Sequence, residues 1–363
     1  MIPFLDLGAA YRELKPEIDA AVSRVLESGQ YILGGEVEAF EAEWATYCEA
    51  EHAVGLANGL DALTLALRAL DIGPGDEVIV PSNTYIATWL AVSGVGATPI
   101  PIEPDPATHN IDPTRIEAAI TPRTRALLPV HLYGQPANLD PIRYIAHRYG
   151  LRVIEAAAQA HGARYKGRRI GAHGDIVCWS FYPGKNLGAL GDAGAITTNN
   201  AALAQRVTLL RNYGSRQKYV NDEAGVNSRL DPIQAAVLRV KLSHLDAWTV
   251  RRRNIAALYT ARLVDINLIL PHVPDWAEPV WHLYTVRTSD REALQAQLTK
   301  AGVSTLIHYP IPPHMQAAFA HLGIPADSLP IAQTLADEVL SLPIGPQLRH
   351  DAPMRVIEAI RAG

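Results

Sequence analysis

Short apolar runs alternate with amphipathic segments through the first two thirds of the chain. One segment repeats leucine at helical spacing from Leu60 to Leu70, and Gly73-Pro74-Gly75 ends that helix because proline cannot continue the turn. Repeated strand–helix–strand units need crossover connections and predict a mostly parallel sheet buried on both faces. The strands of this α/β sheet are predicted at His52–Leu56, Glu77–Pro81, Thr98–Glu103, Arg125–Tyr133, Leu151–Ala158, Asp175–Tyr182 and Gly194–Thr198.

The pattern changes after about residue 230. Leu230–Leu263 is predicted to form two helices with a break near Leu245-Asp246. Further elements are predicted at Trp281–Val286, Arg291–Ala301, Val303–Pro313 and Pro353–Ala362. The chain is therefore predicted to have a large domain over residues 1–245 and a smaller α+β domain over residues 246–363.

Composition and charge argue against several classes of protein. The 363 residues carry a formal net charge of -5, so the chain has no general field that would attract nucleic acid. No apolar run approaches the roughly 18–20 residues needed to cross a bilayer. Cys48 and Cys178 lack metal-ligand spacing and are predicted to be reduced thiols. These features predict a soluble cytoplasmic protein without a metal site, a membrane segment or a nucleic-acid partner.

The turns that follow the strands carry the candidate chemistry, because doubly wound sheets bind ligands beyond the carboxyl ends of their strands. Asn58-Gly59-Leu60-Asp61 follows the first strand at the start of a helix. Free backbone N–H groups and the positive helix end favour phosphate there. An ordinary N-cap by Asn58 or Asp61 is the alternative explanation.

Lys185 lies in a glycine- and proline-containing loop directly after an apolar strand, in the stretch Trp179–Gly188. An amine that loses solvation there should have a lowered pKa, and a neutral amine can attack an aldehyde to form a Schiff base. Ser180 could donate its hydroxyl to a phosphate in the same pocket. A solvated surface lysine is the alternative if Lys185 is considered alone.

Lys185 does not stand alone, because the chain resembles the DegT-type sugar aminotransferases over essentially its whole length. The ordered motifs that carry the resemblance are SGQYILGG, ANGLDAL, PSNTYIAT, PVHLYGQ, EAAAQAHGARYKG, SFYPGKNLGALGDAG, RNYGSRQKY, GVNSRLDPIQAA and IHYPIPPHMQ. The resemblance implies the aspartate-aminotransferase fold, which is pyridoxal-phosphate fold type I. It also implies pyridoxal 5'-phosphate as the cofactor, with pyridoxamine 5'-phosphate as its amino form.

The resemblance implies a role for each matching residue. Lys185 holds the cofactor as an imine and shuttles a proton. Asn227 reaches the phosphate of the neighbouring subunit's cofactor, so that a homodimer with shared active sites is expected. The other cofactor contacts implied are the phosphate-binding Gly59, Leu60, Asp61 and Ser180, the ring-stacking Tyr85, position 156, and Gln159 near the 3-hydroxyl. The candidates for the sugar-nucleotide pocket are Tyr182, His308, Tyr309, His314 and Gln316. Structural, hydrogen-bonded histidines remain the alternative for His308 and His314.

The family divides by the position of the ketone. Leucine in ANGLDAL, together with PSNTYIATWLAV and SFYPGKNLGALGDAG, is similar to the group that acts at C3 of dTDP-linked 3-keto-6-deoxyhexoses, usually with glutamate as the amino donor. A C4 aminotransferase acting on a nucleotide-linked 4-keto sugar is the alternative. A dehydratase of the same fold would carry histidine in place of Lys185.

One position departs from the family. Where relatives read E-D-A-A, this chain has Glu155-Ala156-Ala157-Ala158. The missing aspartate normally keeps the pyridine nitrogen protonated, and Glu155 is a poor substitute because adjacent strand residues point to opposite faces. A charge-assisted contact contributes on the order of 1.5–3 kcal/mol. Transamination is therefore expected to be slowed roughly tenfold to a few hundredfold. A regulatory or catalytically impaired protein that binds cofactor or sugar nucleotide is the alternative that Ala156 favours.

Overall fold

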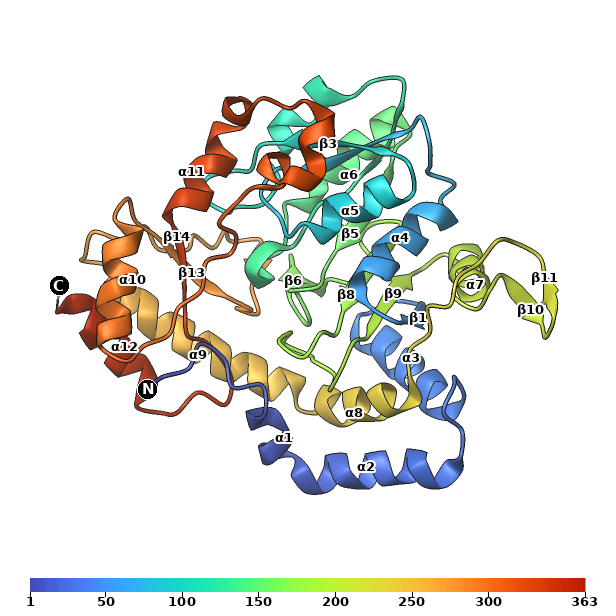
Figure 1. Cartoon of the computed structure of the whole chain (residues 1–363), viewed down its shortest axis with the longest axis horizontal. Helices are drawn as coiled ribbons and strands as arrows, with labels where there is room; N and C mark the ends of the chain where they lie inside the picture. Colours follow the sequence, from blue (N-terminus) through green and yellow to red (C-terminus); the bar gives the residue numbers. More distant parts are fainter. Residues whose placement is uncertain (363) are drawn as a thin grey trace.

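The computed structural model describes residues 1–362 and has a large part and a smaller part side by side (Figure 1). The large part is built on a seven-stranded sheet with the strand order β1-β9-β8-β5-β4-β2-β3. Strand β9 is antiparallel to both neighbours, and the other pairs are parallel. The strands are β1 (His52–Leu56), β2 (Glu77–Pro81), β3 (Thr98–Ile102), β4 (Thr124–Leu127), β5 (Arg152–Ala156), β8 (Ile176–Ser180) and β9 (Gly194–Thr198). The predicted α/β fold class is confirmed, and each strand predicted for the sheet is present.

Helices cover both faces of this sheet because its strands are apolar on both sides. One face packs against α4 (Gly59–Ala69), α5 (Ala87–Gly94) and α7 (Ala201–Leu210). The other face packs against α3 (Gly35–Tyr47), α6 (Leu139–Tyr149) and α8 (Pro232–Leu242). The N-terminal helices α1 (Ala9–Glu13) and α2 (Lys15–Ser28) lie along α8 and the following helix, α9 (Leu245–Leu263). Side chains of β5 alternate between the faces: Ile154 packs on the side of α4, α5 and α7, and Val153 packs on the side of α6.

Some predicted strands are longer than the observed ones. The segment predicted from Arg125 to Tyr133 ends as β4 at Leu127. Pro129 has no N–H to donate to a ladder, and Tyr133 adopts a left-handed backbone conformation with φ of 60°. Beyond β4 the chain stays hydrogen-bonded to Ala156 of β5 as far as His131, and it then turns toward the smaller part of the molecule.

The smaller part packs three helices around an antiparallel strand pair, and a fourth helix leads into the second of these strands. Its elements are α9 (Leu245–Leu263), α10 (Arg291–Lys300), α11 (Pro330–Glu338), α12 (Ala352–Arg361), β13 (Tyr284–Arg287) and β14 (Val339–Leu342). Ile2, at the other end of the sequence, packs in the same core and pairs with Val303. Both ends of the chain therefore lie beside these helices (Figure 1). We propose residues 245/246 as the domain boundary, at the start of α9 and just after the break between α8 and α9 at residues 243–244.

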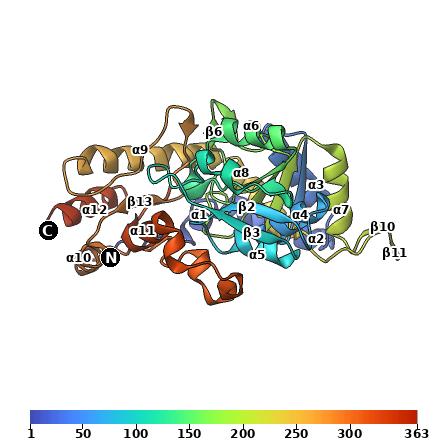
Figure 2. The same ribbon diagram turned by 90° about the horizontal axis from the view of Figure 1, so that it is seen from above.

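Two minor sheets complete the fold. Strand β6 (Arg164–Tyr165) pairs with β7 (Arg168–Arg169) and with β12 (Ala277–Glu278), which ties the two parts together. The hairpin of β10 (Ser215–Gln217) and β11 (Val220–Asn221) projects from the end opposite the smaller part in both views (Figures 1 and 2). No helix within residues 1–362 is both long and apolar enough to span a membrane. Cys48 and Cys178 are buried and unpaired, as predicted.

Candidate active site

Lys185 lies in the loop that follows β8, where the chain turns tightly on itself. Its backbone N–H donates to the carbonyl of Tyr182 at 2.8 Å, and Lys241 of α8 donates from Nζ to the carbonyl of Gly188 at 2.6 Å. The Lys185 side chain keeps some exposure, but burial by the surrounding protein lowers its pKa to about 8. A larger neutral fraction of this amine is therefore present near neutral pH than in a solvated lysine.

The N-terminus of α4 lies directly against the end of β8. A Cβ added to Gly59 would lie 2.5 Å from Cβ of Ser180, so only glycine permits this approach. Asn58 is the N-cap, and its side chain accepts from the N–H of Asp61 at 2.8 Å. This confirms the predicted N-cap, yet the N–H groups of Gly59 and Leu60 find no acceptor within residues 1–362. Two free amides and the Ser180 hydroxyl thus converge on one point suited to a phosphate.

Strand β5 presents different chemistry to its two faces. Ala156 lies in the apolar core beside Cys178 and Val130. Glu155 points to the opposite face, is fully buried, and accepts a hydrogen bond of 2.9 Å from Nε2 of His131. Nε2 carries the proton because Nδ1 of His131 accepts from a backbone N–H. The expectation that Glu155 turns away from the neighbouring position 156 is confirmed.

Gln159, Tyr309 and Tyr85 contact one another in a chain that begins at the backbone of Tyr133. Gln159 accepts from the N–H of Tyr133 at 2.5 Å and donates from Nε2 to the hydroxyl of Tyr309 at 3.1 Å. The rings of Tyr85 and Tyr309 lie 5.5 Å apart, and Tyr85 is 57% exposed. An exposed ring held against a second tyrosine is available to stack on a planar ligand.

The sequence matches a family model described as the DegT/DnrJ/EryC1/StrS aminotransferase family over residues 12–361. The chain belongs to this family.

The family assignment is supported by relatives that align along almost the full chain. A dTDP-3-amino-3,4,6-trideoxy-alpha-D-glucose transaminase of Streptomyces venezuelae is 58% identical over 99% of this chain and 95% of its own length. The erythromycin biosynthesis sensory transduction protein EryC1 of Saccharopolyspora erythraea is 58% identical over 100% of this chain and 99% of its own length. The crystal structure of S. venezuelae DesV in complex with a ketimine intermediate superposes with a TM-score of 0.98, at 58% identity over 99% of this chain and 98% of that one.

As a DegT/DnrJ/EryC1/StrS family member, the chain is a pyridoxal-phosphate-dependent sugar aminotransferase. Its residues fit the cofactor at two places. The close contact between Gly59 and Ser180 and the free amides of α4 suit the phosphate, and the lowered pKa of Lys185 suits an amine that bonds to an aldehyde. Position 156 does not fit in the usual way, because alanine offers the ring nitrogen no charge.

The remaining cofactor candidates lie around this family site. Asp61 belongs to the α4 turn, with its N–H already bonded to Asn58. Asn227 is exposed and pairs with Asn212 at the base of the projecting hairpin. The hydroxyl of its neighbour Ser228 accepts from the N–H of Ala57, which directly precedes the turn Asn58–Asp61 at the start of α4. This exposure leaves the Asn227 side chain accessible to another subunit.

The substrate candidates fall into two groups. Tyr182 is 54% exposed at the mouth of the Lys185 loop, and His308 is half-buried with Nδ1 2.9 Å from the hydroxyl of Ser341. His314 is buried, with Nε2 3.2 Å from the carbonyl of Ala326, as the structural alternative predicts. Gln316 donates to the carbonyl of Ile311 within the same turn. Among the described residues, the side chains of His314 and Gln316 hydrogen-bond within the smaller domain, whereas His308 is linked to Gln159 and Tyr309 through Tyr133, whose hydroxyl donates to the His308 carbonyl.

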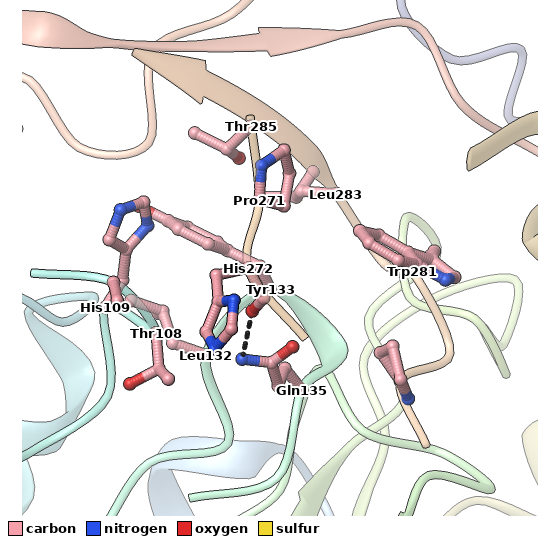
Figure 3. A pocket seen from close by; sticks show the side chains of 12 residues that line it. Thr108, His109, Leu132, Tyr133, Gln135, Pro271, His272, Trp281, Leu283 and Thr285 are labelled. Atoms are coloured by element: carbon pink, nitrogen blue, oxygen red, sulfur yellow. Dashed lines mark hydrogen bonds between the residues drawn. The ribbon is translucent and has the colours of Figure 1, made fainter. Parts of the chain in front are cut away.

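Two cavities lie away from Lys185. One of about 710 Å³ follows the free edge of β1 between α3 and α7 and contains none of the candidate residues. A cavity of about 30 Å³ lies where the two parts of the molecule meet, between Tyr133 and Trp281, and Gln135 donates to the carbonyl of His272 beside it (Figure 3). This space admits water and is too small for a sugar nucleotide. Within residues 1–362, no group of three His, Cys, Asp or Glu side chains could hold a metal ion.

Three residues near Lys185 were missed by the sequence analysis. Lys241 supports the loop from α8, Asn186 follows Lys185, and His282 approaches from the smaller domain. Asn186 lies in the motif SFYPGKNLGALGDAG directly after Lys185, and its polar side chain in this loop could have marked it as a candidate. His282 and Lys241 had no such signal, because only the fold brings them to the loop.

Proposed function

We propose that this enzyme transfers an amino group from glutamate to the C3 ketone of a dTDP-linked keto-6-deoxyhexose. The observation that carries the proposal is the position of Lys185 in the loop after β8, because the last residue of this strand, Ser180, lies against the start of α4 with its free amides, and burial in the loop lowers the pKa of Lys185. The C3 assignment is supported by the name of the 58% identical Streptomyces transaminase, which specifies a 3-amino sugar.

The residues would divide the work as follows. Pyridoxal phosphate, when bound, would supply an aldehyde that bonds to amines and a ring that draws electrons from the adjacent carbon. Gly59, Leu60 and Ser180 would hold its phosphate, and Tyr85 would cover its ring. Lys185 would hold it as an imine and then move a proton at the reacting carbon, which a neutral amine can accept.

The sugar nucleotide would bind at the junction of the two parts of the molecule. Tyr182, which is part of the Lys185 loop, would contact it together with His308 and Tyr309, and we keep His314 and Gln316 as further candidates. We further propose a cytoplasmic homodimer in which Asn227 reaches the partner's phosphate. The exposed position of Asn227 at the base of the projecting hairpin supports this assembly.

Ala156 would make the enzyme slower than a relative with aspartate there. The apolar surroundings of Ala156 and the separate hydrogen bonds of Glu155 support this expectation. Without a carboxylate, protonation of the ring nitrogen is less favourable and the ring accepts electrons less readily.

Two measurements test the activity. Borohydride reduction of the cofactor-loaded protein, followed by peptide mass spectrometry, should place the label on Lys185; an unlabelled lysine would refute the proposal. Side-by-side assays with dTDP-linked 3-keto and 4-keto sugars and glutamate should show turnover of the 3-keto sugar. Exclusive use of the 4-keto sugar would instead establish the C4 alternative.

A binding or regulatory role without turnover is the second candidate, and Ala156 is the observation that favours it. Absorbance spectroscopy separates the two roles. An enzyme should show a cofactor band that shifts when glutamate is added, whereas a binder should keep its band unchanged.

A further inference from the structure

A segment of the smaller domain, residues 279–283, is hydrogen-bonded to two loops of the site. The N–H of Val280 donates to the carbonyl of Gly134 at 2.9 Å, and its carbonyl accepts from Nδ2 of Asn186 at 2.9 Å. Asn186 follows Lys185 directly in the chain. The position of this segment is therefore coupled to the loop that carries the amine.

The same asparagine fixes the tautomer of His282. Because Nδ2 of Asn186 donates to Val280, its Oδ1 faces the other way and lies 3.1 Å from Nδ1 of His282. An amide oxygen only accepts, so Nδ1 of His282 must carry the hydrogen. Nε2 is left with a free lone pair and has no partner within residues 1–362.

His282 is also fixed from the smaller domain. Arg252 of α9 is buried and donates from one nitrogen to the carbonyls of Trp281 at 3.1 Å, His282 at 3.4 Å and Ile344 at 3.2 Å. Burial, then the charges of Lys185 and Arg252, hold the pKa of His282 well below its usual value. The imidazole is thus neutral at physiological pH.

Two further titratable groups that act on His282 are imidazoles. His161 and His308 add to the effect of the charges of Lys185 and Arg252. Burial, with a contribution from the charge of Lys185, lowers the pKa of His161 to about 3 and that of His308 to about 4. A neutral acceptor can orient an amine without the large rise in its pKa that a carboxylate would cause.

We propose that His282 is a positioning residue for Lys185, accepting a hydrogen bond at Nε2 from the free lysine amine while Asn186 holds the imidazole as the Nδ1–H tautomer. The flexible four-carbon side chain of Lys185 allows its amine to reach this acceptor when the amine is not bonded to the cofactor. This role rests on the proposed function, in which the lysine must alternate between a bonded and a free state.

The test is the pH dependence of Lys185 acylation in cofactor-free protein, measured by peptide mass spectrometry. The wild-type midpoint should lie near pH 8. His282→Glu should raise it by about one unit or more, because a carboxylate favours the ammonium form, and should slow acylation at pH 7.5 roughly tenfold. His282→Gln should keep the wild-type midpoint, and His282→Leu should lower it by removing the acceptor.

His244→Gln is the matched control, since His244 is partly exposed and bonds to Glu17 far from the loop. A wild-type midpoint in His282→Glu would overturn the proposal. If that variant does not fold, the Leu and Gln variants decide: equal midpoints in the two would overturn it as well. Borohydride labelling of wild-type Lys185 is independent of these shifts, so the proposed function and the role of His282 fail separately.

Discussion

The chain forms the two ends of the proposed cofactor site in different ways. At the phosphate end, the close contact between Gly59 and Ser180 directs backbone N–H groups and a hydroxyl to one point. At the ring end, the position proposed to meet the pyridine nitrogen is Ala156, and the adjacent carboxylate, Glu155, is hydrogen-bonded on the other face of the strand. Backbone donors can be crowded by a side chain but are not removed by a substitution, whereas a charge supplied by one strand residue is lost in a single substitution.

Lys185 lies between the two ends, and removing it should have the largest effect. We expect Lys185→Ala to lower turnover by roughly 10³-fold or more, as expected for loss of a nucleophile. Both ends remain intact, so cofactor should still bind without a covalent bond. Steady-state kinetics and a spectrum of the reconstituted variant would check this, and substantial remaining turnover would show that another amine carries the reaction.

A carboxylate restored at position 156 should give the ring end a charged contact to the cofactor, as the phosphate end already has donors for the phosphate. Ala156→Asp is expected to raise the turnover number about tenfold to a few hundredfold, since the added contact contributes on the order of 1.5–3 kcal/mol. Ala156→Asn is the control, because it has similar size without the charge and should gain much less. Equal turnover in Ala156→Asp and the unmodified enzyme would contradict the comparison.

Crowding the phosphate end should weaken it. In Gly59→Ala the new Cβ would lie 2.5 Å from Cβ of Ser180. Forcing these groups apart costs about 1–3 kcal/mol, which corresponds to roughly 5- to 150-fold weaker cofactor binding. Titration of cofactor-free protein by absorbance would measure the dissociation constant. Gly35→Ala is the matched control: Gly35 also begins a helix, and a Cβ there meets nothing within 4 Å.

The other face of β5 should affect stability rather than chemistry. Burial alone would raise the pKa of Glu155, but hydrogen bonds from His131 and the N–H of Gly174 bring it below the usual value. The folded state therefore binds this proton less readily than the unfolded chain does. The stability that Glu155 contributes is present above its unfolded pKa and is lost as the pH decreases. Glu155→Gln should lower the free energy of unfolding at pH 7 by about 1.5–3 kcal/mol.

The stability difference between Glu155→Gln and the unmodified protein should be complete above about pH 4.5 and disappear as the pH falls through the lower folded pKa. Denaturant titrations at several pH values would show this. The absorbance of the bound cofactor should not change in Glu155→Gln. A changed cofactor band would mean that Glu155 acts on the ring nitrogen after all.

Much of this architecture was predictable because it is local in sequence. The strands at His52–Leu56, Glu77–Pro81 and Gly194–Thr198 were predicted with their observed bounds, since each is a short apolar run between turns. The phosphate turn and the Lys185 loop were also predicted, because each is one continuous motif. The predicted strand through Tyr133 was too long, because apolar character continues after Pro129 although the regular ladder ends at Leu127 and an isolated bridge at Val130 follows it.

The sequence by itself determined the fold class and the family, and it singled out Lys185 and Ala156 as the positions that the predictions above test. Only the tertiary structure decided which groups surround that lysine. Asn186 and His282 are 96 residues apart in the chain, and Lys241 lies 53 residues from the carbonyl it supports. No periodicity or motif encodes such pairs, because their contact depends on how the smaller domain packs against the loop after β8.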